Sequence, residues 1–249
     1  MASNSETGHA KNVANFKDLI AVCTGLGATY NPSKTSLKAG ELNGKLKNSQ
    51  QSIKTLNQLT PLLTNAINER ENIYEPLSKL AARINAAVVS SEVPSNLLPD
   101  VKTLTRKLQG KRATPKKDDP PKDPQNPGEE GPKNISVSQL SFDSMYNNLE
   151  KLIELLAAQD GYVPNETDLS VTGLRAMLTQ MDTLNTAVLN AQKPVVNART
   201  ARNTELYHPE TGLVKIANGV KAYIKSVFTM KSPEYKQVSR LQFDKPRDN

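Results

Sequence analysis

The stretch that decides the fold is YNPSKTSLKAGELNGKLKNSQQSIKTLNQLTPLLTNAINERENIYEP, residues 30–76. It opens and closes on Tyr-x-Pro, at Tyr30 and Tyr74. The residue before a proline is pushed out of the helical region, so each Tyr-x-Pro predicts a turn. Between the turns, one stripe of residues recurs in alternating steps of four and three, which is typical of one face of a helix. The stripe is Leu42, Leu46, Ser49, Ile53, Leu56, Thr60, Leu63, Ile67, Arg70 and Tyr74.

This stripe keeps its phase at Pro61, so the sequence predicts one kinked helix that begins near Thr35 or Ser36 rather than two separate helices. Shorter helices are expected on both sides of it. Phe16, Leu19, Ile20 and Cys23 share one face of a helix over residues 12–27, and Leu77, Leu80, Ile84 and Val88 share one face of a helix over residues 77–90.

The same pattern recurs in the second half of the chain, between Tyr162 and Tyr207. Pro194 falls within one residue of the place of Pro61. The tail PDVKTLTR, residues 99–106, is answered by PEYKQVSR, residues 233–240. Agreement at so many places predicts an internal duplication. The other matching apolar positions are Leu149, Leu152, Ile153 and Leu156 for the first helix, Leu169, Leu174, Leu178, Met181, Val188 and Val195 for the long one, and Leu213, Ile216, Val220 and Ile224 for the third.

The expected fold is therefore all-α: an elongated antiparallel helical bundle built from two tandem three-helix repeats related by a pseudo-twofold. Each repeat alone leaves an apolar face open, so we expect one shared core; two separate three-helix domains are the alternative. The predicted division is a disordered N-terminus 1–11, repeat 1 over 12–109, a linker 110–134 rich in proline and charge, repeat 2 over 135–243, and a disordered C-terminus 244–249.

The composition is 37% hydrophobic and 23% charged, with no Trp, which suits helices packed on helices. The one cysteine, Cys23, excludes an internal disulfide and lies in an apolar run, so we interpret it as a buried side chain. Residues 1–10 lack the apolar core of a secretory signal, and no run of residues is apolar enough to span a membrane. These features predict a cytoplasmic protein.

The motifs of common enzymes are missing from the sequence. Its two histidines, His9 and His208, form no Glu-x-x-His pair, which argues against a metal site in the bundle. There is no phosphate-binding loop, no dinucleotide-binding glycine motif and no Gly-x-Ser-x-Gly elbow. We therefore expect no enzymatic activity, no cofactor and no metal. An enzyme or small-ligand site built from Asp, Arg and Tyr alone would leave no such motif and stays an alternative.

Three sets of residues are candidates for binding. Arg70 and Arg202 fall at the same place in the stripe, and with Arg199 they form a candidate anion or partner site, although pairing with nearby Glu is the simpler interpretation. A run of cations without an acid is a candidate basic patch for nucleic acid or an anionic surface, although it has no interleaved aromatic residue. Its members are Lys102, Arg106, Lys107, Lys111, Arg112, Lys116 and Lys117.

The repeated tail is the third candidate. Its apolar residues mix helical and strand-like spacing, so it either packs on its own bundle or contacts a partner. The residues are Tyr235, Lys236, Val238, Arg240, Leu241 and Phe243.

The sequence as a whole predicts a structural, scaffold or adaptor protein that acts through helical surfaces on a protein partner or on a second copy of itself. Nucleic-acid binding is an alternative. The net charge of +7 is spread as a surplus of +5 over residues 1–110, +1 over 111–134 and +1 over 135–249. The charge is thus uneven, and the densest basic run is the one over residues 102–117.

Overall fold

The computed structural model describes residues 8–111 and 140–245, and in these two ranges every regular element is a helix. The all-α prediction is thus confirmed. The described chain divides into two compact units. Unit 1 combines Met1–Thr64 with Leu189–Asn249, and unit 2 is Asn65–Val188.

The two long helices predicted from the stripe are both present and are divided between the units. Helix α2 spans Ala39–Tyr74 with Pro61 inside it, and α6 spans Val171–Tyr207 with Pro194 inside it. Helix α2 begins later than the sequence predicts. Thr35–Leu37 forms a 3-10 turn, and Lys38 then adopts an extended conformation, which prevents the turn from continuing into the helix.

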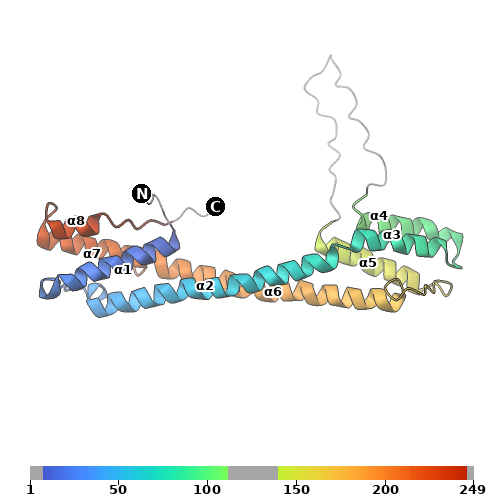
Figure 1. The fold of residues 1–249 in the computed structure, drawn as a ribbon, viewed down its shortest axis with the longest axis horizontal. Coiled ribbons are helices and arrows are strands. Elements are labelled where there is room, and N and C mark those ends of the chain that lie inside the picture. Colours follow the sequence, from blue (N-terminus) through green and yellow to red (C-terminus); the bar gives the residue numbers. More distant parts are fainter. Residues whose placement is uncertain (1–7, 112–139, 246–249) are drawn as a thin grey trace, which may run out of the picture. The chain divides into compact units, whose positions relative to one another are not determined.

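In unit 1, α1 (His9–Gly25), α7 (Leu213–Phe228) and α8 (Pro233–Ser239) pack against one another, as Figure 1 shows. The segment predicted to be disordered over 1–11 is therefore helical from His9 on. After Ser239 the chain turns at Arg240 and then runs without regular secondary structure as far as Lys245. The mixed spacing seen in the sequence thus corresponds to one short helix followed by this irregular segment.

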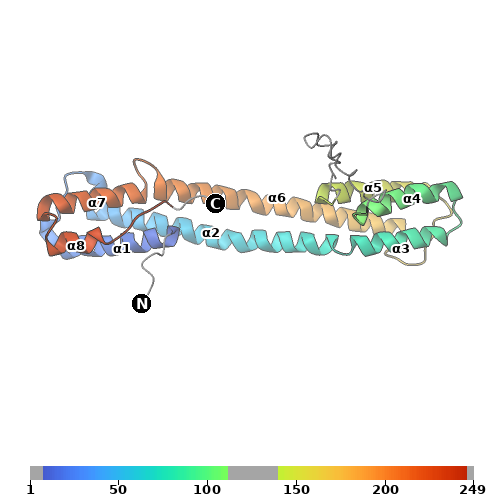
Figure 2. The same cartoon turned by 90° about the horizontal axis from the view of Figure 1, so that it is seen from above.

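In unit 2, α4 (Leu98–Leu108) contacts both α3 (Leu77–Val89) and α5 (Phe142–Ala157), and Figure 2 gives a second view of this layer. Gly110 and Lys111 of the predicted linker follow α4, and the rest of the linker lies outside the described residues. The two long helices begin differently. Helix α6 begins directly after Ser170, whose Oγ accepts a hydrogen bond from Gly173 N (3.0 Å).

Each unit has its own apolar core, and each core draws on both halves of the sequence. In unit 1 the core joins α1 residues such as Phe16 and Leu19 to α7 residues such as Val220 and Ile224. In unit 2 it joins Ile84 and Val101 of the first half to Leu152 and Ile153 of the second. The single shared core expected from the sequence is thus replaced by two cores, and neither compact unit coincides with one predicted repeat.

One hydrogen bond recurs in both units, at positions that match between the two halves of the sequence. The hydroxyl of Tyr30 donates to Leu37 O (2.7 Å) in unit 1, and that of Tyr162 donates to Leu169 O (2.8 Å) in unit 2. Each tyrosine thereby ties its Tyr-x-Pro turn to the start of a long helix. Among the described residues, no helix combines the length and apolar character needed to cross a membrane.

Candidate functional site

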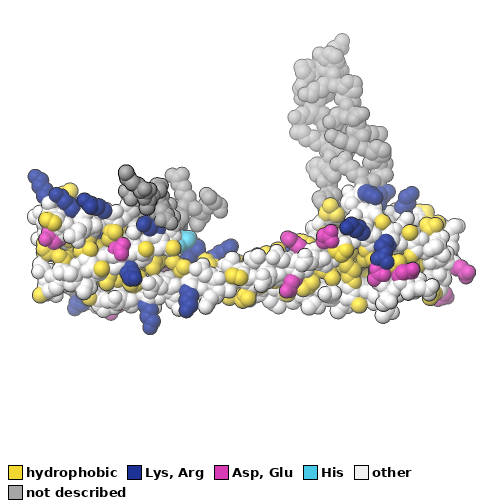
Figure 3. Space-filling model, viewed as in Figure 1, with side chains coloured by type: hydrophobic (Ala, Val, Ile, Leu, Met, Phe, Trp, Pro, Cys, Tyr) yellow, Lys and Arg dark blue, Asp and Glu magenta, His cyan; other side chains and the backbone are white. Residues whose placement is uncertain are grey.

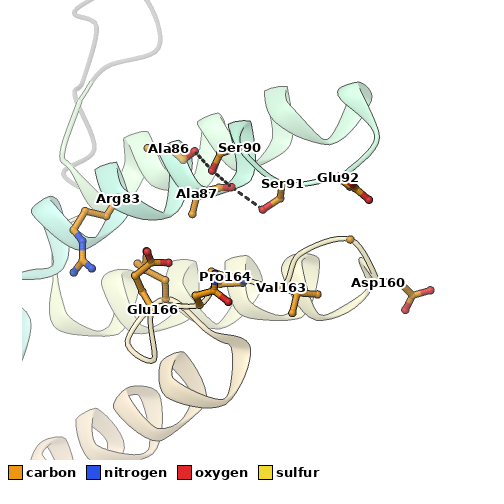
Figure 4. A pocket seen from close by; sticks show the side chains of 13 residues that line it. Arg83, Ala86, Ala87, Ser90, Ser91, Glu92, Asp160, Val163, Pro164 and Glu166 are labelled. Atoms are coloured by element: carbon orange, nitrogen blue, oxygen red, sulfur yellow. Dashed lines mark hydrogen bonds between the residues drawn. The ribbon is translucent and has the colours of Figure 1, made fainter.

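Unit 2 contains an open groove of about 730 Å³ between the end of α3 and the Tyr-x-Pro turn at Tyr162. Figure 4 shows both walls, with Ala86 and Ala87 on α3 facing Val163 and Pro164 on the turn. Helix α3 contributes small side chains here, so the groove stays open. The two serines that follow, Ser90 and Ser91, both donate to backbone carbonyls of α3 and so leave the groove free.

One end of the groove is closed by a tight contact between two loops. Gly161 packs so closely on the Glu92 carbonyl that a Cβ at this position would collide with it. Only glycine lacks that atom, and the contact therefore requires glycine here. The loop after α3 and the loop before Pro164 are thereby held together at the end of the groove.

Three carboxylates, Glu92, Asp160 and Glu166, line the groove, and none of them has an ion-pair partner among the described residues. The one cation in the lining, Arg83, is occupied by Asp168: its Nη2 donates to Oδ1 (3.1 Å) and its Nη1 to Oδ2. This bidentate pair holds the pKa of Asp168 below its usual value.

Tyr162 lies between two lining residues in the chain, Gly161 and Val163, but is itself almost completely buried and does not line the groove. Burial raises its pKa to about 12, and the nearby Glu166 carboxylate adds to the effect. A negative charge beside a buried phenol disfavours the phenolate, so Tyr162 stays a neutral hydrogen-bond donor to Leu169 O. The groove lining itself combines the three carboxylates with small and apolar side chains such as Ala86, Ala87 and Leu169.

The corresponding place in unit 1 is filled by a side chain. In the alignment of the two halves, which matches Leu77 with Leu213 and Val88 with Ile224, Ala87 corresponds to Tyr223. The Tyr223 ring packs edge-on against Tyr30, with ring centroids 5.3 Å apart, and its hydroxyl accepts a hydrogen bond from Asn31 N (3.0 Å). What remains nearby is a hollow of about 250 Å³ lined by Lys34, Gly219 and their neighbours.

The candidate arginines lie in different units. Arg70 belongs to unit 2, where its guanidinium stacks on the Phe142 ring 4.0 Å from the centroid and its Nε is buried without a hydrogen-bond partner. Arg199 and Arg202 belong to unit 1, where Arg199 is exposed and Arg202 donates to Asn203 Oδ1 (2.9 Å). The contacts of Arg70 and Arg202 are thus local to each unit, and whether any of the three binds an anion stays a prediction.

The candidate basic run begins on α4 in unit 2. Lys102 is exposed there, Arg106 and Lys107 are half-buried, and Lys111 follows the helix end. Arg112, Lys116 and Lys117 lie outside the described residues. The three cations on α4 belong to the unit whose described residues carry 9 Lys and Arg against 12 Asp and Glu.

The candidate tail packs on its own unit. Val238 and Phe243 are buried in the core of unit 1, Tyr235 and Leu241 are half-buried against it, and Lys236 and Arg240 are exposed. Side chains of α1 hold its backbone: Asn15 Nδ2 donates to Gln242 O (2.7 Å), and Asn12 Nδ2 donates to Asp244 O (2.7 Å). The apolar residues of the tail are therefore engaged within unit 1.

Sequence reasoning missed the groove because an alanine in an apolar stripe carries no signal of its own. The comparison of Ala87 with Tyr223 in the two halves would have pointed to it. Within residues 8–111 and 140–245, no cluster of three or more His, Cys, Asp or Glu side chains is arranged to hold a metal ion. Comparisons with protein-family models, curated proteins and solved structures found no match to this chain.

Proposed function

We propose that this protein is a non-enzymatic adaptor that holds a segment of a protein partner in the groove of unit 2. The observation that carries the proposal is the open place at Ala87, where the corresponding place in unit 1 is occupied by Tyr223. The volume of the groove falls within the range of about 300–1,000 Å³ that is usual for ligand sites. The groove lining offers carboxylates and backbone groups that can form ion pairs and hydrogen bonds with the partner segment.

We also propose that the two halves of the chain, residues 12–109 and 135–243, are two tandem three-helix repeats. The recurring tyrosine hydrogen bonds support this, as does a second pair of contacts. Tyr74 packs edge-on against Phe142 at 4.8 Å in unit 2, and Tyr207 packs against His9 at 5.6 Å in unit 1. The pseudo-twofold relation between the copies stays a prediction.

Selection of peptides from a random library on the full-length protein tests the adaptor function. Peptides that bind the groove should lose binding to the variant Ala87→Tyr, because the new ring takes the position that Tyr223 has in unit 1. The matched control is Ala82→Tyr, which adds the same ring to an exposed position of α3 outside the groove lining. A selection in which no peptide distinguishes Ala87→Tyr from the wild type would overturn the proposal.

A second candidate function is binding of nucleic acid by unit 1, and charge is the observation that favours it. The described residues of unit 1 carry 17 Lys and Arg against 6 Asp and Glu. Figure 3 shows dark-blue side chains projecting over α1, α7 and α8. Such a surplus can neutralise backbone phosphates, and the affinity would then fall steeply with salt.

Two triple variants locate this activity. Reversal to Glu at the exposed Lys225, Lys231 and Lys236 of unit 1 should weaken binding of a duplex DNA at least about tenfold at low salt. The same reversal at Lys102, Arg106 and Lys107 should leave it nearly unchanged. Equal losses in fluorescence anisotropy titrations of the two variants would exclude unit 1 as the specific binding surface.

A further inference from the structure

The chemistry of the groove occupant can be inferred by comparing the two units, and this inference rests on the adaptor function proposed above. In unit 1 the Tyr223 phenol has two partners. Its ring packs against Tyr30, and its hydroxyl oxygen accepts the hydrogen bond of Asn31 N. These contacts satisfy an otherwise exposed backbone donor and cover one side of the half-buried Tyr30.

Unit 2 has counterparts of Tyr30 and Asn31 but has no phenol at the place of Tyr223. Tyr162 takes the place of Tyr30, with the same hydroxyl bond to the start of the long helix. Val163 takes the place of Asn31; its backbone N–H makes no hydrogen bond to any described residue, and its side chain is 77% exposed. Ala87 stands where Tyr223 would supply the ring. The groove therefore retains an unbonded N–H at Val163 and open space beside Ala87, and together these fit a phenol.

The charge of the groove specifies what surrounds that phenol. Glu92, Asp160 and Glu166 line it without ion-pair partners among the described residues, and Arg83 is occupied by Asp168. Three unpaired carboxylates around one groove favour a cationic ligand and disfavour an acidic one. The site is thus complementary to positive charge on both sides of a ring.

We propose that the groove binds a tyrosine side chain of a partner protein, in a segment that carries Lys or Arg next to it. The tyrosine oxygen accepts from Val163 N, and its ring packs against Ala87 and Leu169, which both line the groove. The neighbouring cations pair with Glu92, Asp160 and Glu166. The segment 112–139 of this chain is excluded as the occupant, because it contains cations but no aromatic residue.

Short capped peptides titrated into the isotope-labelled full-length protein test the proposal by NMR. The peptide with a central Lys-Tyr-Lys should shift the Val163 amide resonance and saturate. Lys-Ala-Lys, which lacks the ring, should bind at least about tenfold more weakly, since the ring supplies most of the apolar contact. Glu-Tyr-Glu should also bind at least about tenfold more weakly, since it places like charges against the three carboxylates.

Substitutions in the two units provide reciprocal controls. Ala87→Tyr should abolish the Lys-Tyr-Lys shifts, and Ala82→Tyr should not. Tyr223→Ala should open the corresponding place in unit 1 and make the Asn31 amide responsive to tyrosine peptides. This second site should prefer Glu-Tyr-Glu, because the hollow beside it is lined by two cations, Lys34 and Lys215, against one acid, Glu210.

Three results would overturn the inference: equal affinity for Lys-Tyr-Lys and Lys-Ala-Lys, equal affinity for Lys-Tyr-Lys and Glu-Tyr-Glu, or no Val163 shift at about 10 mM Lys-Tyr-Lys. The library selection separates this failure from that of the adaptor function. Selected peptides that require an open Ala87 position but lack tyrosine would overturn the tyrosine assignment alone. Absence of any Ala87-dependent peptide would overturn both.

Discussion

Units 1 and 2 share a framework and differ in what covers it. Both tie a Tyr-x-Pro turn to the start of a long helix, and both bury one face of a short helix from each half of the chain. Unit 1 then adds Tyr223 over its turn, and unit 2 leaves Ala87 there. The difference teaches that the framework shared by both units is covered by a tyrosine in one unit and stays open beside an alanine in the other.

The ends of the two units differ as well. Helix α4 continues to Leu108, whereas α8 ends at Ser239 and the chain then runs without regular secondary structure under the side chains of Asn12 and Asn15. Such a segment does not satisfy its own backbone groups, so neighbouring side chains must do so. Unit 1 therefore depends on buried polar contacts at a place where unit 2 relies on helical hydrogen bonds.

The largest expected effect comes from the two cores. Leu19→Ala in unit 1 and Leu152→Ala in unit 2 each remove a fully buried side chain, and each should lower the free energy of unfolding by about 2–5 kcal/mol. Because the cores are separate, hydrogen exchange should accelerate mainly in the unit that carries the substitution. Uniform acceleration across both units in either variant would show that they unfold as one and would break the comparison.

Next in size is the exchange of the covering residue. Tyr223→Ala should lower the free energy of unfolding by about 2–3 kcal/mol, because it removes the ring contact with Tyr30 and the acceptor for Asn31 N. Tyr223→Phe keeps the ring and should cost only about 1 kcal/mol. Ala87→Tyr should stay within about 1 kcal/mol of the wild type. Urea denaturation measures all three, and a Tyr223→Ala variant as stable as wild type would contradict the packing described.

The buried asparagines sharpen the comparison further. Asn15→Ala removes the donor to Gln242 O and should cost about 1–2 kcal/mol, with faster hydrogen exchange over residues 240–245. Asn148 is the corresponding buried residue of unit 2, and Asn148→Ala should leave that segment protected. The exposed Asn48→Ala serves as a neutral control. Unchanged exchange of the tail in Asn15→Ala would mean that the core contacts of Val238 and Phe243 alone hold it.

The smallest effect concerns alkaline pH and unit 1 alone. Burial raises the pKa of Cys23 from an ordinary value of 9.0 to about 11. The folded state therefore resists forming the thiolate, so its stability is constant below pH 9 and falls as the pH rises through 9 to 11. At pH 10 the loss should be about 1 kcal/mol. Cys23→Leu places in unit 1 the residue type that unit 2 has at Leu156, and it should remove this part of the pH dependence in urea titrations.

Much of the helical framework could be predicted from local pattern. The stripe of the long helix continued past Pro61, and the helix does too, because one missing hydrogen bond does not outweigh the packing of the apolar face. The turns at Tyr30 and Tyr162 followed from proline chemistry. The start of α2 and the helical state of His9 were missed, because end positions depend on neighbours that are distant in sequence; His9 contacts Tyr207.

The candidate site could not be predicted from local sequence pattern for the same reason. Ala87, Val163 and Glu92 are ordinary in their own segments and become a groove only where α3 meets the turn after α5. Likewise, the surplus of +5 over residues 1–110 gave no sign that the positive charge is concentrated in unit 1. Unit 1 combines cations from both ends of the chain.

The sequence by itself determined the helices, their turns and the apolar face that each must bury, because periodicity and proline act over a few residues. Only the tertiary structure decided which faces meet, and so produced two cores in place of one and separated the charge between them. It also left one place open beside Tyr162 and filled the other beside Tyr30. Those outcomes depend on contacts between residues far apart in the chain, which no local pattern encodes.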